Sequence, residues 1–156
     1  MPSTQQYCCV VIPKSVDLGG VWNVLPPGIH TATLDEIEQR FATNEKRREL
    51  FDGFCRAVHA LRQAGCGVIF LDGSFITDKP EPGDFDVCWE PAGVDPKKLD
   101  SIFLDFSQRR KNQKDKYGGE FFPSSAKADR VSAFLDFFQT DRDTGLAKGI
   151  IKVQLQ

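Results

Sequence analysis

Two short apolar segments joined by a turn-forming loop constrain the fold of this chain most strongly. The first segment, 68–71, precedes the pair Gly73-Ser74, and the second occupies residues 84–89. The nine residues between Ser74 and Asp84 include two prolines and a glycine, which favour a turn. Short apolar runs bounded by turn residues are typical of buried strands. The sequence therefore predicts a strand, a Gly-Ser turn, a loop and a returning strand.

The returning strand carries two acids at alternating positions. Because successive side chains of a strand point to opposite faces, Asp84 and Asp86 are expected on one face and Phe85 and Val87 in the core. Two neighbouring carboxylates repel each other unless a cation lies between them, and Mg²⁺ prefers such oxygen ligands. Together with a Gly-Ser turn that can bind phosphates, the pair suggests a site for a nucleoside triphosphate. The alternative is an Asp-x-Asp on a solvated strand or loop.

One motif resembles the signature of the nucleotidyltransferase superfamily, which has the fold of DNA polymerase beta. It consists of Gly73-Ser74, nine further residues and then Asp84-Phe85-Asp86-Val87. The flanking segments LPPGIHTATLDEIEQRF and FFQTDRDTGLAKGIIKVQL extend a resemblance to small nucleotidyltransferase-like proteins from Leu25 onward. The superfamily includes minimal nucleotidyltransferase antitoxins, which adenylylate partner toxins. The resemblance implies that a nucleoside monophosphate is transferred from ATP, or another nucleoside triphosphate, to an acceptor hydroxyl. Asp84 and Asp86 would hold two Mg²⁺ ions.

The superfamily also uses a third carboxylate on a later strand, and Glu120 is the candidate. It lies between Gly119 and the pair Phe121-Phe122 in a predicted strand, where an acid is costly unless it is paired, hydrogen-bonded or metal-bound. Glu120 would complete the metal site and help to deprotonate the acceptor hydroxyl. The alternatives are a strand-edge glutamate that faces water and, as third acid, Asp105 on the polar face of a predicted helix.

The resemblance assigns nucleotide binding to Gly73, Ser74 and Lys79. Antitoxin relatives carry an arginine in a Gly-Ser-x-Ala-Arg-Gly pattern, whereas this chain reads Gly-Ser-Phe-Ile-Thr-Asp-Lys, so Lys79 either contacts phosphate or is an exposed loop lysine. Basic residues in segment 109–116 either guide a nucleotide or RNA end or belong to a solvated helix end and loop. Arg142 and Lys148 flank the turn before the last strand, and they either reach the cleft or point away from it.

Capping signals and periodicity predict the remaining elements. Thr33 and Glu36 form a capping-box signal for a short helix. A longer helix is expected over 44–63, with a buried apolar stripe: Leu50, Phe51, Phe54, Val58 and Leu61. Asp95-Pro96 predicts the start of another helix whose apolar face continues to Phe106. A strand at 119–123, a helix around 131–138 and a strand at 151–155 follow, while 1–27 is irregular apart from a possible edge strand at 10–12. We therefore expect one domain, 1–156, of the α/β (α+β) class with a small mixed sheet flanked by helices.

Composition excludes several other classes. The chain of 156 residues is 40% hydrophobic with thirteen phenylalanines, which is enough for one globular core. A net charge of −2 argues against general DNA binding. The absence of a long apolar run and of a signal-peptide pattern predicts a cytoplasmic protein without a membrane partner.

The five cysteines have no CxxC spacing, which disfavours a zinc site. Cys55, Cys66 and Cys88 are expected as reduced core residues. A catalytic Cys–His pair is the alternative.

Two kinds of function remain open. The first is an enzyme, a nucleotidyltransferase with a toxin-like partner protein or RNA as acceptor. The second is a non-catalytic module with the same fold, such as an antitoxin subunit or a nucleotide sensor. Retention of Asp84, Asp86 and Glu120 favours the enzyme, whereas the altered loop after Ser74 favours the module.

Overall fold

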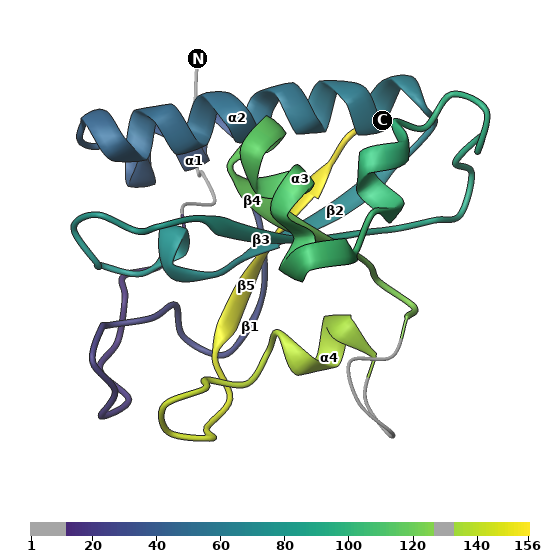
Figure 1. Cartoon of the computed structure of the whole chain (residues 1–156). Helices are drawn as coiled ribbons and strands as arrows, with labels where there is room; N and C mark the ends of the chain where they lie inside the picture. The colour runs from purple at the N-terminus through teal and green to yellow at the C-terminus, as the bar shows by residue number, and fades with distance from the viewer. Residues whose placement is uncertain (1–11, 127–132) are drawn as a thin grey trace, which may run out of the picture.

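A computed structural model describes residues 12–126 and 133–156 (Figure 1). Its centre is a five-stranded sheet of order β1-β5-β2-β3-β4. The β1–β5 and β3–β4 pairs are parallel, whereas β2 is antiparallel to both β5 and β3. The strands are β1 Gly28–Thr31, β2 Val68–Asp72, β3 Phe85–Trp89, β4 Gly119–Pro123 and β5 Gly149–Gln154. The expected mixed α/β sheet flanked by helices is confirmed, although β1 was not predicted.

Helices α1 (Leu34–Phe41) and α2 (Glu45–Gln63) follow β1, as the capping-box signal predicts for α1 and the apolar stripe predicts for α2. The Glu36 N–H donates to Thr33 Oγ1 at 3.1 Å, and the Arg47 N–H donates to Asn44 Oδ1 at 2.9 Å. These bonds satisfy N–H groups that lack a partner within the helix. The predicted stripe of α2 is buried against the sheet: Leu50, Phe51, Phe54, Val58 and Leu61.

The prediction of a helix that begins at Asp95 is wrong. The segment forms turns and a short 3₁₀ helix, Ser101–Leu104, because Asp95 and Asp100 each accept a hydrogen bond from the backbone two residues later. Leu99 and Ile102 still pack against the core and Phe103 is buried in it, whereas Phe106 is exposed.

The helix of this region is α3 (Ser107–Tyr117), which lies in the basic stretch. Tertiary contacts anchor this polar helix. Gln113 is buried, donating to the Ile102 carbonyl at 3.0 Å and accepting from the Phe121 N–H at 2.8 Å. Tyr117 stacks on Phe103 with ring centroids 5.2 Å apart.

Some predicted features fall partly outside the described residues. Helix α4 is Phe134–Phe137 with the extended Ala133 as its N-cap, so it is shorter than the helix expected around 131–138, of which residues 131 and 132 lie outside the described part. Of the possible strand at 10–12 only residue 12 is described, and residues 12–27 are irregular apart from a bridge between Val16 and Val24. Cys66 and Cys88 are buried free thiols and Cys55 is half-buried, as expected, whereas Cys8 and Cys9 lie outside the described part. Within 12–126 and 133–156, no helix is long and apolar enough to cross a membrane.

The two faces of the sheet are covered differently. The main core contains inward side chains of β2, β3 and β4 and the buried faces of α1 and α2, which lie above the sheet in Figure 1. The opposite face carries a smaller apolar cluster: Phe70, Cys88, Phe122, Phe138 and Ile150. Since side chains alternate along each strand, residues 72, 86 and 120 belong to this second face.

Candidate functional site

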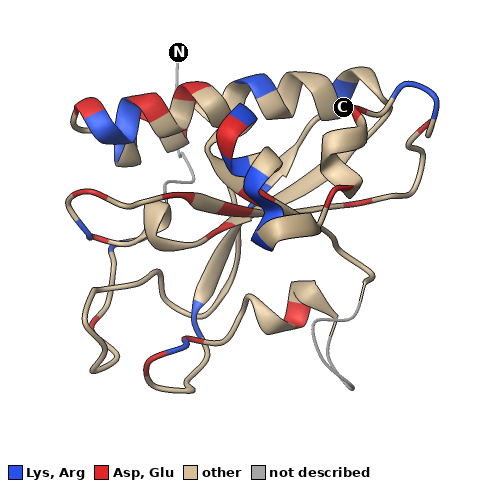
Figure 2. Cartoon of the chain, in the orientation of Figure 1, with Lys and Arg blue, Asp and Glu red and all other residues tan. Residues whose placement is uncertain are grey.

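Three acids lie side by side on the second face of the sheet. Asp72 at the end of β2 is in register with Asp86 on β3, and Asp86 is in register with Glu120 on β4. Asp84 lies two residues before Asp86, and both line one cleft, while Phe85 and Val87 are buried in the main core. We call Asp72, Asp84, Asp86 and Glu120 the acid cluster. In Figure 2 acidic residues in and beside the start of β3 lie next to the basic residues of α3, of which Lys114 pairs with Glu120.

Gly73 brings the end of β2 close to Asp86. Its φ of 93° lies in the left-handed region, and a Cβ there would be 3.0 Å from the Asp86 backbone nitrogen and 3.1 Å from its Oδ2. Only glycine fits this close approach without strain. A 3₁₀ turn, Ser74–Ile76, follows and carries the chain away from the sheet. The Gly-Ser pair predicted from sequence therefore lies against the second aspartate.

The electrostatics of the cluster oppose its ionisation. Burial, followed by the charges of Asp72, Asp84 and Glu120, raises the pKa of Asp86 to about 8. Burial and then the charge of Glu120 raise the pKa of Asp84. Because each charged carboxylate disfavours the next, a cation in the cluster would stabilise the folded protein.

Two lysines already neutralise part of the cluster. Lys148, from the turn before β5, forms an ion pair with the buried Asp72, and Lys114 on α3 pairs with Glu120 at 2.9 Å. Burial is still the largest influence on the pKa of Asp72 and raises it. In the part of the chain that the structure describes, no three Asp, Glu, His or Cys side chains are arranged as a ready metal site. The donor set itself consists of carboxylate oxygens, which are the ligands that Mg²⁺ prefers.

The cluster opens into a cleft of about 780 Å³, which we call the acidic cleft. Five of the six predicted site residues line it: Gly73, Ser74, Lys79, Asp84 and Asp86. Glu120 is not in the lining but is the strand neighbour of Asp86. Arg142 and Lys148 reach the cleft, which answers the question that the sequence left open.

The loop between Ser74 and Asp84 is fixed by one buried arginine. Arg47 on α2 donates to the carbonyls of Phe75, Thr77 and Lys79 at 2.7, 2.8 and 2.5 Å. Lys79 thus has a restrained backbone while its side chain faces the cleft.

Residues of the basic stretch have identifiable partners. Arg110 stacks on Phe122 with its guanidinium carbon 4.0 Å from the ring centroid, and the charges of Glu120 and Asp86 act on it. Lys111 pairs with Asp115 within α3. Asp105, the alternative third acid, accepts from Ser107 and Asn112 and does not line the cleft.

Asp72 and Trp22 are cleft residues that the sequence reasoning missed. Asp72 directly precedes Gly73 at the end of an apolar strand, so pairing the two predicted strands would have placed it opposite Asp86. Trp22 lies in an irregular segment, where no periodic pattern indicates which way a side chain faces.

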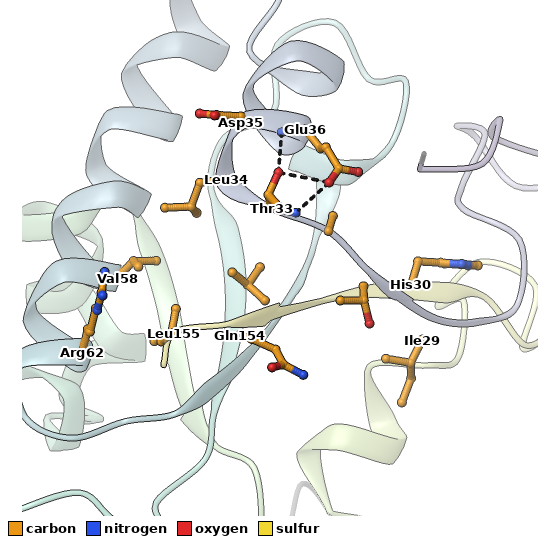
Figure 3. Close-up of a pocket in the computed structure, with 13 residues that line it drawn as sticks. Ile29, His30, Thr33, Leu34, Asp35, Glu36, Val58, Arg62, Gln154 and Leu155 are labelled. Carbon is orange, nitrogen blue, oxygen red and sulfur yellow. Dashed lines mark hydrogen bonds between the residues drawn. The ribbon is translucent and has the colours of Figure 1, made fainter. Parts of the chain in front are cut away.

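A second cavity of about 860 Å³, the β1 cavity, lies between β1, the start of α1 and the ends of α2 and β5 (Figure 3). Thr33 and Glu36, which line it, bind each other as the capping box of α1. His30 Nε2 lies 2.7 Å from the Pro26 carbonyl oxygen. These polar groups serve the fold, and the cavity lining contains no cluster comparable to the acid cluster.

Comparisons with curated proteins and with solved structures give no significant match. One family model, described as "Family of unknown function (DUF6932)", matches residues 21–154. The matched region contains the acid cluster, Gly73-Ser74 and the cleft residues from Val21 to Lys148. The chain therefore belongs to this family.

Proposed function

We propose that the protein is a Mg²⁺-dependent nucleotidyltransferase. It transfers a nucleoside monophosphate from ATP, or another nucleoside triphosphate, to a hydroxyl of a protein or RNA acceptor. The observation that carries the proposal is the register of Asp72, Asp86 and Glu120 on three adjacent strands, with Gly73 in contact distance of Asp86. Three carboxyl groups with raised pKa values in one cleft, those of Asp72, Asp84 and Asp86, are costly to the fold and typical of functional sites.

The chain's own residues supply most of the chemistry. Asp84, Asp86 and Glu120 would hold Mg²⁺, two ions in the full complex, which neutralise the triphosphate and polarise the attacked phosphorus. The Gly73-Ser74 turn receives the phosphates, and Lys79 lies on the same cleft wall. Glu120 accepts the proton of the acceptor hydroxyl. The hydroxyl oxygen then bonds to the α-phosphorus while the bond to the bridging oxygen breaks and pyrophosphate leaves.

The cleft lining carries six aspartates, Asp72, Asp84, Asp86, Asp136, Asp141 and Asp143, and three cations, so a triphosphate would need Mg²⁺ to bind there. Asp78, which would repel a triphosphate, accepts a hydrogen bond from the Asn23 N–H at 2.9 Å and does not line the cleft. Lys79, Arg142 and Lys148 contribute positive charge to the lining. The proposal includes a cytoplasmic location, where ATP and Mg²⁺ are supplied, and a toxin-like protein or an RNA as partner.

A second candidate is a non-catalytic module, an antitoxin subunit or nucleotide sensor. Its support is that Lys148 and Lys114 already pair with Asp72 and Glu120, so the cluster is partly neutralised by the protein itself. This candidate predicts nucleotide binding without turnover.

Transfer of label from ATP tests the proposal. The protein is incubated with labelled ATP, Mg²⁺ and candidate acceptors, including a genetically linked partner protein and RNA. Glu120→Gln should lower the transfer rate by roughly 10²-fold while nucleotide affinity stays within a few-fold, because the lost charge acts in the chemical step. Asp105→Asn is the matched control and should leave transfer unchanged. Binding without labelling of any acceptor by the wild type would favour the non-catalytic module.

A further inference from the structure

The acidic cleft has an aromatic wall that the proposed chemistry does not use. Trp22 and Phe137 line the cleft and are 39% and 49% exposed. Aromatic side chains that line a cleft together with a few polar groups are typical of small-molecule sites. They come from two distant parts of the chain, the segment before β1 and helix α4.

Hydrogen bonds hold the segment of Trp22 in place. On one side the Val21 N–H donates to Asp143 Oδ2 at 3.2 Å. On the other side Asn23 and Asp78 exchange two bonds, the Asn23 N–H to Asp78 Oδ1 at 2.9 Å and the Asp78 N–H to the Asn23 carbonyl at 3.2 Å.

Trp22 is therefore fixed between the loop that follows Gly73-Ser74 and the turn that precedes β5. These bonds hold the backbone on both sides of Trp22, so this segment loses little backbone entropy when a ligand binds.

The lining of the cleft matches a ligand with one aromatic end and one anionic end that binds together with Mg²⁺, because aspartates outnumber cations in the lining. The aromatic wall shares the cleft with Lys79, Arg142 and Lys148 and with the Gly73-Ser74 turn. A volume of about 780 Å³ lies within the range of small-molecule sites. A nucleoside triphosphate combines a flat base with a polyphosphate, and bases of every kind stack on aromatic side chains.

We infer that the base of the bound nucleotide stacks on Trp22, with Phe137 as a second apolar contact and the triphosphate at Gly73-Ser74. This inference rests on the proposed function and adds the location of the base. Because stacking uses the π-face of the base and not its edges, the site accepts different bases.

Titration with two ligands separates the base site from the phosphate site. Calorimetry with Mg²⁺ present compares ATP with inorganic tripolyphosphate, which has the phosphates but no base. Trp22→Ala should weaken ATP binding by roughly 10-fold, within the usual range for one stacked base, and leave tripolyphosphate binding unchanged. Ile29→Ala is the matched control, because Ile29 is similarly exposed, at 44%, but lines the β1 cavity. It should change neither affinity.

Fluorescence provides an independent readout. The chain has two tryptophans, and Trp89 is buried, so Trp89→Phe leaves Trp22 as the sole emitter. ATP should quench this emission, whereas tripolyphosphate should not.

The possible outcomes distinguish the two proposals. Unchanged ATP affinity in Trp22→Ala, with Mg²⁺-dependent binding intact, would overturn the base site and leave the nucleotidyltransferase proposal standing. Failure of the wild type to bind either ATP or tripolyphosphate would overturn both.

Discussion

Two of the cavities formed by the described residues are similar in size but differ in what their polar groups do. In the β1 cavity, of about 860 Å³, Thr33 and Glu36 satisfy each other and begin α1. In the acidic cleft, of about 780 Å³, Asp84 and Asp86 have raised pKa values and repel their neighbours. Polar groups that satisfy each other, as in the capping box, stabilise the fold without a ligand. Charged groups that repel each other destabilise the fold and therefore indicate a ligand site. Charge arrangement, and not volume, therefore locates the candidate site.

The largest expected effect concerns the ion pair between Lys148 and Asp72 in the acidic cleft. Lys148→Met leaves Asp72 buried without its partner, and we expect the free energy of unfolding to fall by about 3–5 kcal/mol. Urea denaturation at pH 7 measures it. Asp72→Asn combined with Lys148→Met should recover most of this loss. If Lys148→Met alone were neutral, the pair would not be buried as described.

The pH dependence of stability tests the raised pKa of Asp86. Its pKa is about 8 in the folded protein and near the ordinary value of 3.8 in the unfolded chain, so between these values the folded state binds the extra proton. Asp86 therefore lowers stability progressively as the pH rises through this window, and its full cost is present above about pH 8.

Melting curves without divalent cations should show the wild-type Tm falling between pH 6 and pH 9. Asp86→Asn, which carries no charge at either pH, should flatten this dependence and raise the Tm at pH 9 by about 5 °C. Added Mg²⁺ should raise the wild-type Tm at pH 9 but not that of the variant. Parallel pH curves for the two proteins would contradict the assignment.

The smallest effect belongs to the β1 cavity. Thr33→Ala removes the helix cap and should cost about 1 kcal/mol of stability while leaving nucleotide binding unchanged. Chemical denaturation and calorimetry measure the two properties on the same sample. A loss of nucleotide affinity in this variant would remove the distinction between the two cavities.

The parts of the fold that were predicted correctly are those that local chemistry determines. The capping box at Thr33, the apolar stripe of α2 and the alternation around Asp86 are encoded within a few residues. Helix α3 was missed because its sequence is almost entirely polar, and its stability depends on Gln113, which bonds to residues outside the helix.

The candidate site shows the same division. Asp84, Asp86 and the Gly-Ser turn follow from spacing along the chain. Asp72 could be placed in the site only from the strand register. Trp22 could be placed there only from the hydrogen bonds that its neighbours Val21 and Asn23 donate to Asp143 and Asp78. Residues that only the tertiary structure brings together cannot be identified from a local sequence pattern.

Metal-dependent nucleotide binding tests the central claim most directly. Calorimetric titration of the wild type with ATP should show binding in Mg²⁺ that weakens strongly with a chelator. Asp84→Asn combined with Asp86→Asn should abolish the Mg²⁺-dependent part, while its far-UV circular dichroism matches the wild type and its Tm is equal or higher, because like-charge repulsion is relieved. Equal Mg²⁺-dependent binding of ATP by the wild type and the double variant would contradict the assignment of these aspartates as metal ligands.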